Sequence, residues 1–296
     1  MGRVNIKNAF AELAIGAVPR SELRLLLADI LGRDTAWLIA NDDYALSDLE
    51  ESKLRTAVAR RSAGEPIAYI LGYREFYGRR FRCTPSALIP RPETELIVET
   101  VLRDTNGHVA AAKKRGPNST ASKPLRVLDV GTGTGCIAIT LALEFNSIGV
   151  HAEVIACDLS RDALALAQVN SRALHANVSF IESDWFSAIN ANEQFDLIVS
   201  NPPYIVPNDP HLFQGDLRFE PWLALQDRVD GLQSYRELVH GAKRHLHDGG
   251  LLIVEHGYDQ GDSVPALFRE AGFVEVKMIR DLAGQARVTR AHLSHL

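Results

Sequence analysis

After Pro124 the chain alternates between short apolar runs and longer amphipathic stretches, and this alternation limits the folds that it can adopt. Helical stretches around residues 136–145, 161–175 and 232–247 separate the runs. The runs have the length and β-branched composition of buried strands; they are LRVLDV (125–130), AEVIAC (152–157), NVSFI (177–181), FDLIVS (195–200) and GLLIVE (250–255). Strands that alternate with helices form βαβ units, so the sequence predicts an α/β fold with a doubly wound parallel sheet. Two last runs, 273–281 and 286–293, are expected to form an antiparallel edge pair.

The first 66 residues have a purely helical pattern. Ser21 precedes apolar residues at helical spacing and is expected to cap that helix; these residues are Leu23, Leu26, Leu27, Ile30 and Leu31. Ser47 and Glu50 have the spacing of a capping box and open a further helix that ends near Gly64. This segment is too small to hold a large active site, so we predict that residues 1–66 form a helical substrate-docking domain.

The remaining boundaries follow changes in composition. Residues 67–90 are rich in aromatic and β-forming residues, and we expect a β-hairpin linker there. Residues 91–296 hold the predicted sheet and form the third domain. Within it, residues 104–124 contain few large apolar side chains, which predicts a flexible, solvated loop.

Composition narrows the class of protein. The chain has 32 Lys and Arg against 37 Asp and Glu, a balance that disfavours a protein that follows DNA phosphates. Residues 51–91 are an exception, with nine basic and three acidic side chains; they are either an ordinary solvated surface or a docking site for an acidic face of the substrate. No run reaches the ~18 apolar residues of a membrane span, and the three cysteines form no CxxC pair. We expect a cytoplasmic monomer that binds neither membrane nor DNA directly.

Three alternate glycines follow the first predicted strand, in the segment Gly131, Thr132, Gly133, Thr134 and Gly135. Glycine lets the backbone turn sharply and lets a ligand approach the amides of a helix N-terminus. The spacing differs from the dinucleotide fingerprint and lacks the P-loop lysine. A merely structural turn is the alternative interpretation, so the motif alone is weakly specific.

Side chains after the next two strands suit an adenosine. Asp158 can accept hydrogen bonds from both ribose hydroxyls. It can also cap the following helix, although Ser160 is available for that. Asp184 and Trp185 follow the third strand and place an acceptor beside an aromatic ring, which suits adenine; simple core packing is the alternative for the tryptophan.

The most specific pattern follows the fourth strand, in the segment Asn201, Pro202, Pro203 and Tyr204. The two prolines remove two N–H donors and fix two φ angles, so the turn is stiff and presents carbonyl groups. Asn201 adds a side-chain carbonyl, and Tyr204 is expected to add an aromatic wall. The segment therefore suits a planar –NH2 group, with an ordinary Asn-Pro turn as the alternative.

Taken in order, GTGTG, Asp158, DW and NPPY resemble class I S-adenosylmethionine-dependent methyltransferases that modify amino groups. NPPY is shared by adenine-N6 DNA methyltransferases and protein glutamine-N5 methyltransferases. The chain is most similar to the glutamine branch, the family of peptide chain release factor glutamine methyltransferases (HemK/PrmC), in the segments EPIAYILGYREFYG, LIPRPETE, VLDVGTGTGCIAI, SDWFSA, IVSNPPYI, DPHLFQGDLRFEP and LLIVEHG. The resemblance covers residues 1–103 and 125–296.

This resemblance implies a Rossmann-like methyltransferase sheet and a set of site residues. S-adenosylmethionine would contact residues 131–135, Asp158, Asp184, Trp185 and Asn201. The glutamine of a class-1 release factor would contact residues 201–204, among which Asn201, Pro202 and Tyr204 would be catalytic. Asn201 Oδ1 and the Pro202 carbonyl would orient the amide nitrogen without a general base. His256 is expected to be structural, and the absence of an HExxH motif predicts no metal.

Three other functions stay open on the sequence. A sister enzyme that methylates a ribosomal-protein glutamine shares the architecture, but its LIPRS-type segment differs from LIPRPETE here. An adenine-N6 DNA methyltransferase would require a target-recognition domain and a basic cleft, and neither is visible. A non-catalytic, cofactor-binding translation scaffold would not require an intact segment 201–204 beside an intact glycine loop.

Overall fold

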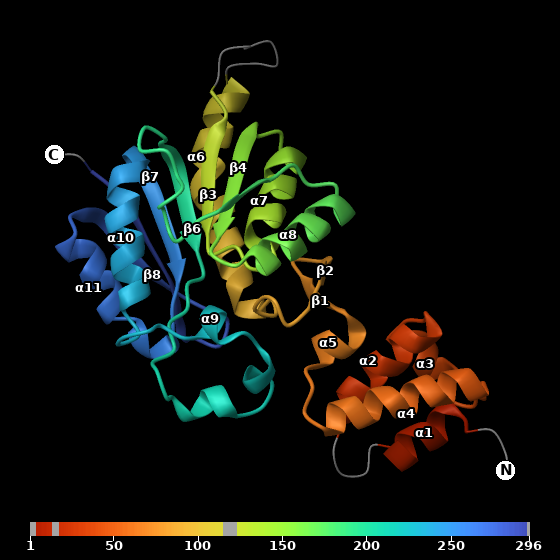
Figure 1. Cartoon of the computed structure of the whole chain (residues 1–296). Helices are drawn as coiled ribbons and strands as arrows, with labels where there is room; N and C mark the ends of the chain where they lie inside the picture. The colour runs from red at the N-terminus through yellow and green to blue at the C-terminus, as the bar shows by residue number, and fades with distance from the viewer. Residues whose placement is uncertain (1–3, 14–17, 115–122, 295–296) are drawn as a thin grey trace. The chain divides into compact units, whose positions relative to one another are not determined.

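The computed structural model describes residues 4–13, 18–114 and 123–294 (Figure 1). They form two compact units: Met1–Tyr73 with Phe213–Phe219, and Arg74–Leu212 with Glu220–Leu296. Within the described residues, no helix combines the length and the apolar character that crossing a membrane requires.

The N-terminal unit is helical, as predicted. Its helices are α1 (Ile6–Leu13), α2 (Arg20–Leu31), α3 (Thr35–Ala40), α4 (Asp48–Ser62) and α5 (Ile67–Leu71). The capping box of α4 is confirmed, because Ser47 Oγ accepts from the Glu50 amide at 3.3 Å and Glu50 Oε2 accepts from the Ser47 amide at 2.7 Å. The prediction for Ser21 is wrong: Pro19 stands at the N-cap of α2, where its φ of −57° already suits a helix start.

The hairpin is shorter than predicted. Its strands are β1 (Tyr73–Phe76) and β2 (Arg79–Arg82), whereas residues 67–71 form the single helical turn of α5. Pro66 stands at the N-cap of α5 and Gly72 ends it in the left-handed conformation, at a φ of 81°. These two residues set the local structure more strongly than the β-forming composition does.

The second unit contains a seven-stranded sheet in the order β5-β4-β3-β6-β7-β9-β8. The strands are β3 (Leu125–Val130), β4 (Ala152–Asp158), β5 (Ser179–Glu182), β6 (Phe195–Ser200), β7 (Leu246–Glu255), β8 (Phe273–Arg280) and β9 (Ala286–Leu293). The first five run parallel, and β9 is antiparallel to both of its neighbours. The doubly wound sheet and its antiparallel edge pair are therefore confirmed, although β7 begins at Leu246 and not at residue 250.

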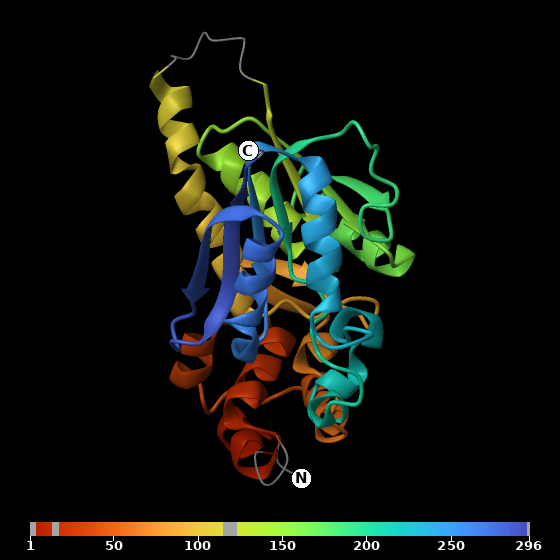
Figure 2. The ribbon, with the colours of Figure 1, turned by 90° about the vertical axis from the view of Figure 1, so that its left-hand side faces the viewer.

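Helices cover both faces of this sheet (Figure 2). They are α6 (Glu95–Lys114), α7 (Cys136–Ser147), α8 (Arg161–Ala173), α10 (Gln233–His245) and α11 (Ser263–Glu270). The short helix α9 (Trp222–Leu225) lies beyond the carboxyl ends of the strands. Successive strand residues point to opposite faces. Val127 accordingly lies in the core with residues of α6 and α7, whereas Leu128 lies in the core with residues of α10 and α11.

The loop expected over residues 104–124 is partly helix. Helix α6 continues to Lys114, so the prediction is wrong for residues 104–114. Ala110, Ala111 and Ala112 have the highest helix propensity of any residue type, and they support a helix without large apolar side chains. Residues 115–122 lie outside the described part of the chain.

Candidate active site

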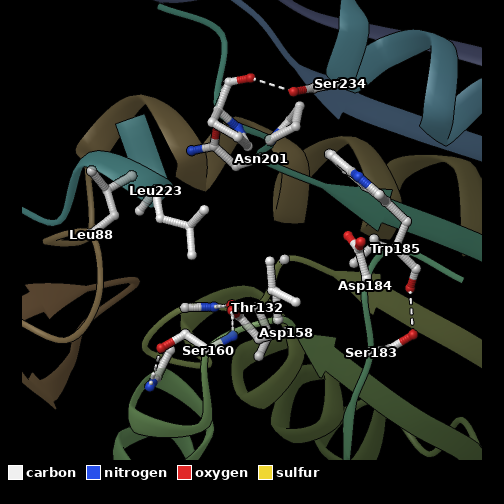
Figure 3. A pocket seen from close by; sticks show the side chains of 18 of the residues that line it. Leu88, Thr132, Asp158, Ser160, Ser183, Asp184, Trp185, Asn201, Leu223 and Ser234 are labelled. Carbon is white, nitrogen blue, oxygen red and sulfur yellow. Dashed lines mark hydrogen bonds between the residues drawn. The ribbon is translucent and has the colours of Figure 1, made fainter. Parts of the chain in front are cut away.

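A cavity of about 860 Å³ opens at the carboxyl ends of β3, β4 and β6, and all of its lining residues belong to the second unit (Figure 3). Strand order reverses between β3 and β6, since the chain runs outward to β4 and β5 before it returns to β6. In doubly wound sheets this switch point is the usual ligand site. The volume lies in the range typical of small-molecule and cofactor pockets.

The first two glycines of the glycine loop leave room for a ligand. Gly131 and Gly133 have φ angles of +74° and +56°, which favour glycine. A Cβ placed on Gly131 would meet no atom within 4 Å, and one on Gly133 would meet only Ala87 Cβ, at 3.9 Å. Both residues line the cavity together with Thr132 and Thr134.

Gly135 has a different position. It is not among the residues that line the cavity, although the sequence predicted it as a cofactor contact. It is the N-cap of α7 and has a φ of +82°, and a Cβ there would lie 2.7 Å from Ile139 Cδ1 and 3.2 Å from Ala167 Cβ. The third glycine therefore allows α7 and α8 to approach closely.

A buried carboxylate in β3 stabilises the glycine loop through hydrogen bonds. Asp129, in β3, accepts hydrogen bonds from Thr132 Oγ1 at 2.7 Å and from the Ala138 amide at 3.2 Å. Its complete burial raises its pKa to about 7. Asp129 thus connects the loop to the first turn of α7.

Asp158 lines the cavity at the end of β4. Its Oδ2 accepts from the Gly133 amide at 2.8 Å and its Oδ1 from the Ser160 amide at 2.9 Å. Ser160 Oγ caps α8 through the Ala163 amide, so Asp158 is not needed as the cap. Burial raises the pKa of Asp158, while the bonds from Ser160 and Gly133 favour the charged form. A carboxylate offers about four lone-pair directions, so acceptor capacity remains for hydroxyl donors.

Asp184 and Trp185 line the cavity after β5. Trp185 has a φ of 52°, a conformation that non-glycine residues adopt at a cost. Ser183 stabilises this conformation, because its hydroxyl donates to the Trp185 carbonyl at 2.9 Å and accepts from the Ala188 amide at 3.0 Å (Figure 3). This strained backbone conformation, which the Ser183 hydroxyl stabilises, places the indole of Trp185 at the cavity wall.

Asn201, Pro202 and Pro203 line the cavity after β6. Asn201 Nδ2 donates to Thr94 Oγ1 at 3.1 Å. The Pro203 carbonyl accepts from Ser234 Oγ at 2.7 Å, which fastens the turn to α10 (Figure 3). Within the described residues, Asn201 Oδ1 and the Pro202 carbonyl accept no hydrogen bond from the chain. The site therefore contains two acceptors that a ligand can use.

Tyr204 does not line this cavity. Its side chain packs instead against the core cluster that contains Tyr235 and Leu238 of α10, and burial raises its pKa. The turn at Pro203 is held by Ser234, so the next side chain enters the core beside α10. The expected aromatic wall is thus provided by Trp185 alone among the predicted residues.

Two further segments, to which the sequence assigned no role, also line the cavity. The first contributes Ser86, Ala87, Leu88, Pro90, Arg91 and Thr94, and the second Pro221, Leu223, Ala224, Gln226, Arg228 and Val229. Glu220 connects them, because its carboxylate accepts from the Ile89 amide at 2.9 Å and pairs with Arg91. Residues 88–94 and Pro221 fall in family-like stretches of the sequence, but spacing alone does not reveal that the two segments meet.

His256 lies outside the lining residues. It is fully buried and its Nδ1 lies 2.9 Å from the Gly257 carbonyl. Burial lowers its pKa, which keeps the ring neutral. The described residues contain no group of three or more His, Cys, Asp or Glu side chains arranged to hold a metal ion.

Comparison with known proteins agrees with this geometry. Residues 6–72 match the PrmC N-terminal domain and residues 121–283 match a methyltransferase domain. A release factor glutamine methyltransferase from Bordetella pertussis is 46% identical over 95% of this chain and 97% of its own length. The enzyme of the same description from Neisseria gonorrhoeae is 43% identical over 96% and 97%. The chain belongs to the release factor glutamine methyltransferase family. Among solved structures, a methyltransferase from Pyrococcus furiosus has a TM-score of 0.49 at 16% identity, covering 84% of this chain and 100% of that one.

As a member of the release factor glutamine methyltransferase family, the chain is an enzyme whose cofactor is S-adenosylmethionine. The cavity fits this group. Open space above Gly131 and Gly133 leaves room for a ligand against bare backbone, and the Asp158 carboxylate at the cavity wall would be an acceptor for ribose hydroxyls. Trp185 would offer a flat surface to a purine, and the neighbouring Asp184 carboxylate would be an acceptor.

Proposed function

We propose that the chain transfers a methyl group from S-adenosylmethionine to the side-chain amide nitrogen (N5) of the glutamine in the Gly-Gly-Gln motif of class-1 peptide chain release factors. The observation that carries this proposal is the pair of acceptors at Asn201 Oδ1 and the Pro202 carbonyl, next to a cavity that suits an adenosine. The names of the relatives in Bordetella pertussis and Neisseria gonorrhoeae support the same substrate.

The chain's own residues account for most of the chemistry. A primary amide nitrogen is a weak nucleophile, because its lone pair is delocalised into the carbonyl group. Asn201 Oδ1 and the Pro202 carbonyl can each accept one N–H, which aims the nitrogen and stabilises the positive charge that develops on it. When bound, S-adenosylmethionine supplies the electrophilic methyl group. The surplus proton leaves after transfer, so no general base is required beforehand.

Preorganisation of the acceptors follows from the turn itself. Pro202 and Pro203 have fixed φ angles, and the bond from Ser234 to the Pro203 carbonyl holds the turn against α10. Acceptors that are already in place pay little reorganisation cost when charge appears. The enzyme thus contributes mainly by positioning the substrate amide and by stabilising the charge that develops on its nitrogen.

Docking of the release factor is a separate proposal. We propose that residues 1–66 and the basic stretch 51–91 contact the protein substrate. Internal ion pairs reduce the charge that this stretch can offer: Arg61 pairs with Glu22 at 2.6 Å, Arg60 with Glu65, and Arg79 with Glu144. Charge reversal at Arg79 would therefore disturb the hairpin as well as any docking.

Mass spectrometry tests the proposed function directly. Unmethylated release factor is incubated with the enzyme and S-adenosylmethionine, and adenine-containing duplex DNA is the parallel substrate. We expect one added methyl on the glutamine of the Gly-Gly-Gln motif and none on DNA. Methylation of adenine alone would overturn the substrate. Methylation of neither, with the cofactor still bound, would direct the search to a ribosomal-protein glutamine.

A further inference from the structure

Asn170 is a buried asparagine in α8 whose side-chain amide hydrogen-bonds to three main-chain groups. The residue is 2% exposed. Its Oδ1 accepts from the Arg82 amide at 2.8 Å, and its Nδ2 donates to the Arg82 carbonyl at 3.2 Å. The same nitrogen donates to the Thr134 carbonyl at 2.9 Å. One side chain therefore joins the end of β2 to the glycine loop, two parts of the chain that are far apart in the sequence.

The pattern of donors and acceptors fixes the orientation of this amide. Nδ2 carries two hydrogens and Oδ1 carries none. Nδ2 faces two carbonyl oxygens and Oδ1 faces an N–H, so each end of the amide meets its complement. A flipped amide would place Oδ1 against both carbonyl oxygens and leave these acceptors without a donor, which is costly. The two hydrogens of Nδ2 are thus committed, one to β2 and one to the glycine loop.

On the side of the hairpin, Asn170 takes the place of a strand partner. β1 and β2 form a two-stranded sheet, which leaves the outer edge of β2 without a strand beside it among the described residues. A neighbouring strand would pair with the N–H and the C=O of one residue, and the Asn170 amide does the same with Arg82. The hairpin is itself well anchored, since Phe81 is fully buried with residues of α6 and α7, and the Tyr77 amide donates to Glu95 Oε1 at 2.8 Å. β2 therefore provides a firm support.

On the side of the glycine loop, Asn170 adds an anchor at the far end of the loop. The amides of Gly131 and Thr132 both donate to the Cys157 carbonyl at 2.9 Å, which holds the first part of the loop to β4. Asn170 holds the last part to α8 and β2 through Thr134. Thr134 lines the cavity, whereas Asn170 is not among the lining residues. Asn170 can therefore affect a ligand only through the loop.

The chain that leaves β2 forms another wall of the same cavity. Ser86, Ala87 and Leu88 follow β2 and line the cavity. A Cβ placed on Gly133 would lie 3.9 Å from Ala87 Cβ, so this wall and the glycine loop are close neighbours. Asn170 bonds to the strand that leads into one wall and to the loop that forms the other, so it holds the two walls in a fixed relation.

We propose that Asn170 is a positioning residue for S-adenosylmethionine, which sets the conformation of the glycine loop from outside the cavity and does not touch the cofactor. The loop is then in its binding conformation before the cofactor arrives, so the cost of ordering it does not reduce the affinity. The inference concerns the cofactor site and does not depend on the identity of the protein substrate.

Calorimetry with a matched control tests the proposal. Asn170→Ala removes all three bonds. Ser171→Ala removes a bond of the same kind from the next residue of α8, because the Ser171 hydroxyl donates to the Ala176 carbonyl at 2.8 Å and Ser171 is 6% exposed. Urea unfolding should show that both variants are less stable than wild type. We expect S-adenosylmethionine affinity to fall about tenfold in Asn170→Ala, the effect of one hydrogen bond, and to stay near wild type in Ser171→Ala. Equal affinities in the two variants would overturn the proposal.

Asn170→Asp separates the donor from the shape of the side chain. The carboxyl that it introduces keeps an acceptor for the Arg82 amide, but when ionised it has no hydrogen for the two carbonyl oxygens. Burial beside these oxygens raises the pKa of such a carboxyl, and its neutral form can donate one hydrogen. We expect the affinity of Asn170→Asp, taken as a ratio to wild type at each pH, to recover about threefold or more between pH 8 and pH 5.5. A ratio that is constant with pH would show that donation by Nδ2 does not set the affinity, and would overturn the proposal.

One measurement uses the wild-type chain alone. Hydrogen exchange of the Asn170 side-chain amide, assigned in triple-resonance spectra, reports whether its two hydrogens are held before the cofactor binds. We expect slow exchange in the free enzyme and little change when S-adenosylmethionine is added. Fast exchange in the free enzyme that slows on binding would mean that the cofactor orders the loop, which would overturn the proposal. None of these assays uses a protein substrate, so a failure to methylate a release factor would count against the proposed function alone.

Discussion

The two ends of the Asn201 amide differ. Nδ2 donates to Thr94 Oγ1, whereas Oδ1 accepts no hydrogen bond from the described residues. Asn201→Ala removes the acceptor from the reacting nitrogen. We expect kcat to fall at least ~100-fold, as when an oxyanion-hole donor is removed, with S-adenosylmethionine affinity little changed. Single-turnover kinetics and calorimetry measure the two quantities. A variant with near-wild-type turnover would show that Asn201 does not bind the reacting amide.

Asp158 is predicted to act on the cofactor and not on turnover. Its carboxylate lines the cavity and already orients the Gly133 amide. Asp158→Ala should weaken S-adenosylmethionine binding by roughly tenfold to a hundredfold, the effect of losing hydrogen bonds to a charged group. Ser160→Ala is the control, because it removes the cap of α8 and costs stability of about 1 kcal/mol. Calorimetry that gives both variants the same affinity would contradict the assignment.

At the scale of elements, the glycines of the loop have two different roles: Gly131 faces open space where a ligand can lie, and Gly135 allows close packing of helices. Gly131→Ala and Gly135→Ala both place a side chain at positive φ, which costs about 1–2 kcal/mol. Only Gly135→Ala also crowds Ile139 and Ala167, so its free energy of unfolding should fall further, by about 1–3 kcal/mol. Gly131→Ala should instead lose more S-adenosylmethionine affinity. Urea unfolding and calorimetry of the pair give the comparison, and equal losses in both assays would contradict it.

The elements that the sequence predicts well are those whose pattern is set by burial. Runs 125–130 and 195–200 are strands at the predicted bounds, because both faces of the sheet are covered and each run is apolar throughout. The predicted secondary structure is wrong where a few residues with strong local backbone preferences outweigh the overall composition of the segment. Pro66 and Gly72 convert an apparent strand into α5, and three alanines extend α6 into an expected loop.

The site follows the same division. Residues at the carboxyl ends of strands are predictable, because the topology must bring them to one edge; Asp158, Trp185 and Asn201 do meet at one cavity. Tyr204 and Gly135 are adjacent in sequence to cavity residues, yet the turn and the helix start direct them into the core. The contact between Thr94 and Asn201 joins residues far apart in the chain, and no spacing rule reveals it.

At the scale of the whole molecule, two fully buried carboxyl groups make stability depend on pH. Burial raises the pKa of Asp129 and of Glu255 to about 7 in the folded state, from ordinary values of 3.8 and 4.5. The folded state therefore holds these protons more tightly than the unfolded state does. Their contribution to stability is complete below pH ~4 and is lost as pH rises toward 7. Asp230 is exposed, and its hydrogen bond with Arg236 lowers its pKa to about 2. Its contribution to stability has the opposite pH dependence to that of the buried groups, and it is lost only in more acidic solutions.

Glu255→Gln isolates one of these groups, because it keeps the shape and removes the titration. Between pH 5 and pH 8, the free energy of unfolding of wild type should fall relative to the variant by on the order of 2 kcal/mol, since one pKa unit corresponds to about 1.4 kcal/mol. Urea unfolding at pH 5, 6.5 and 8 measures the difference. Glu270→Gln, on the exposed end of α11, is the control and should track wild type. A difference between wild type and Glu255→Gln that is constant across this range would mean that Glu255 is not held as a buried, proton-binding carboxyl.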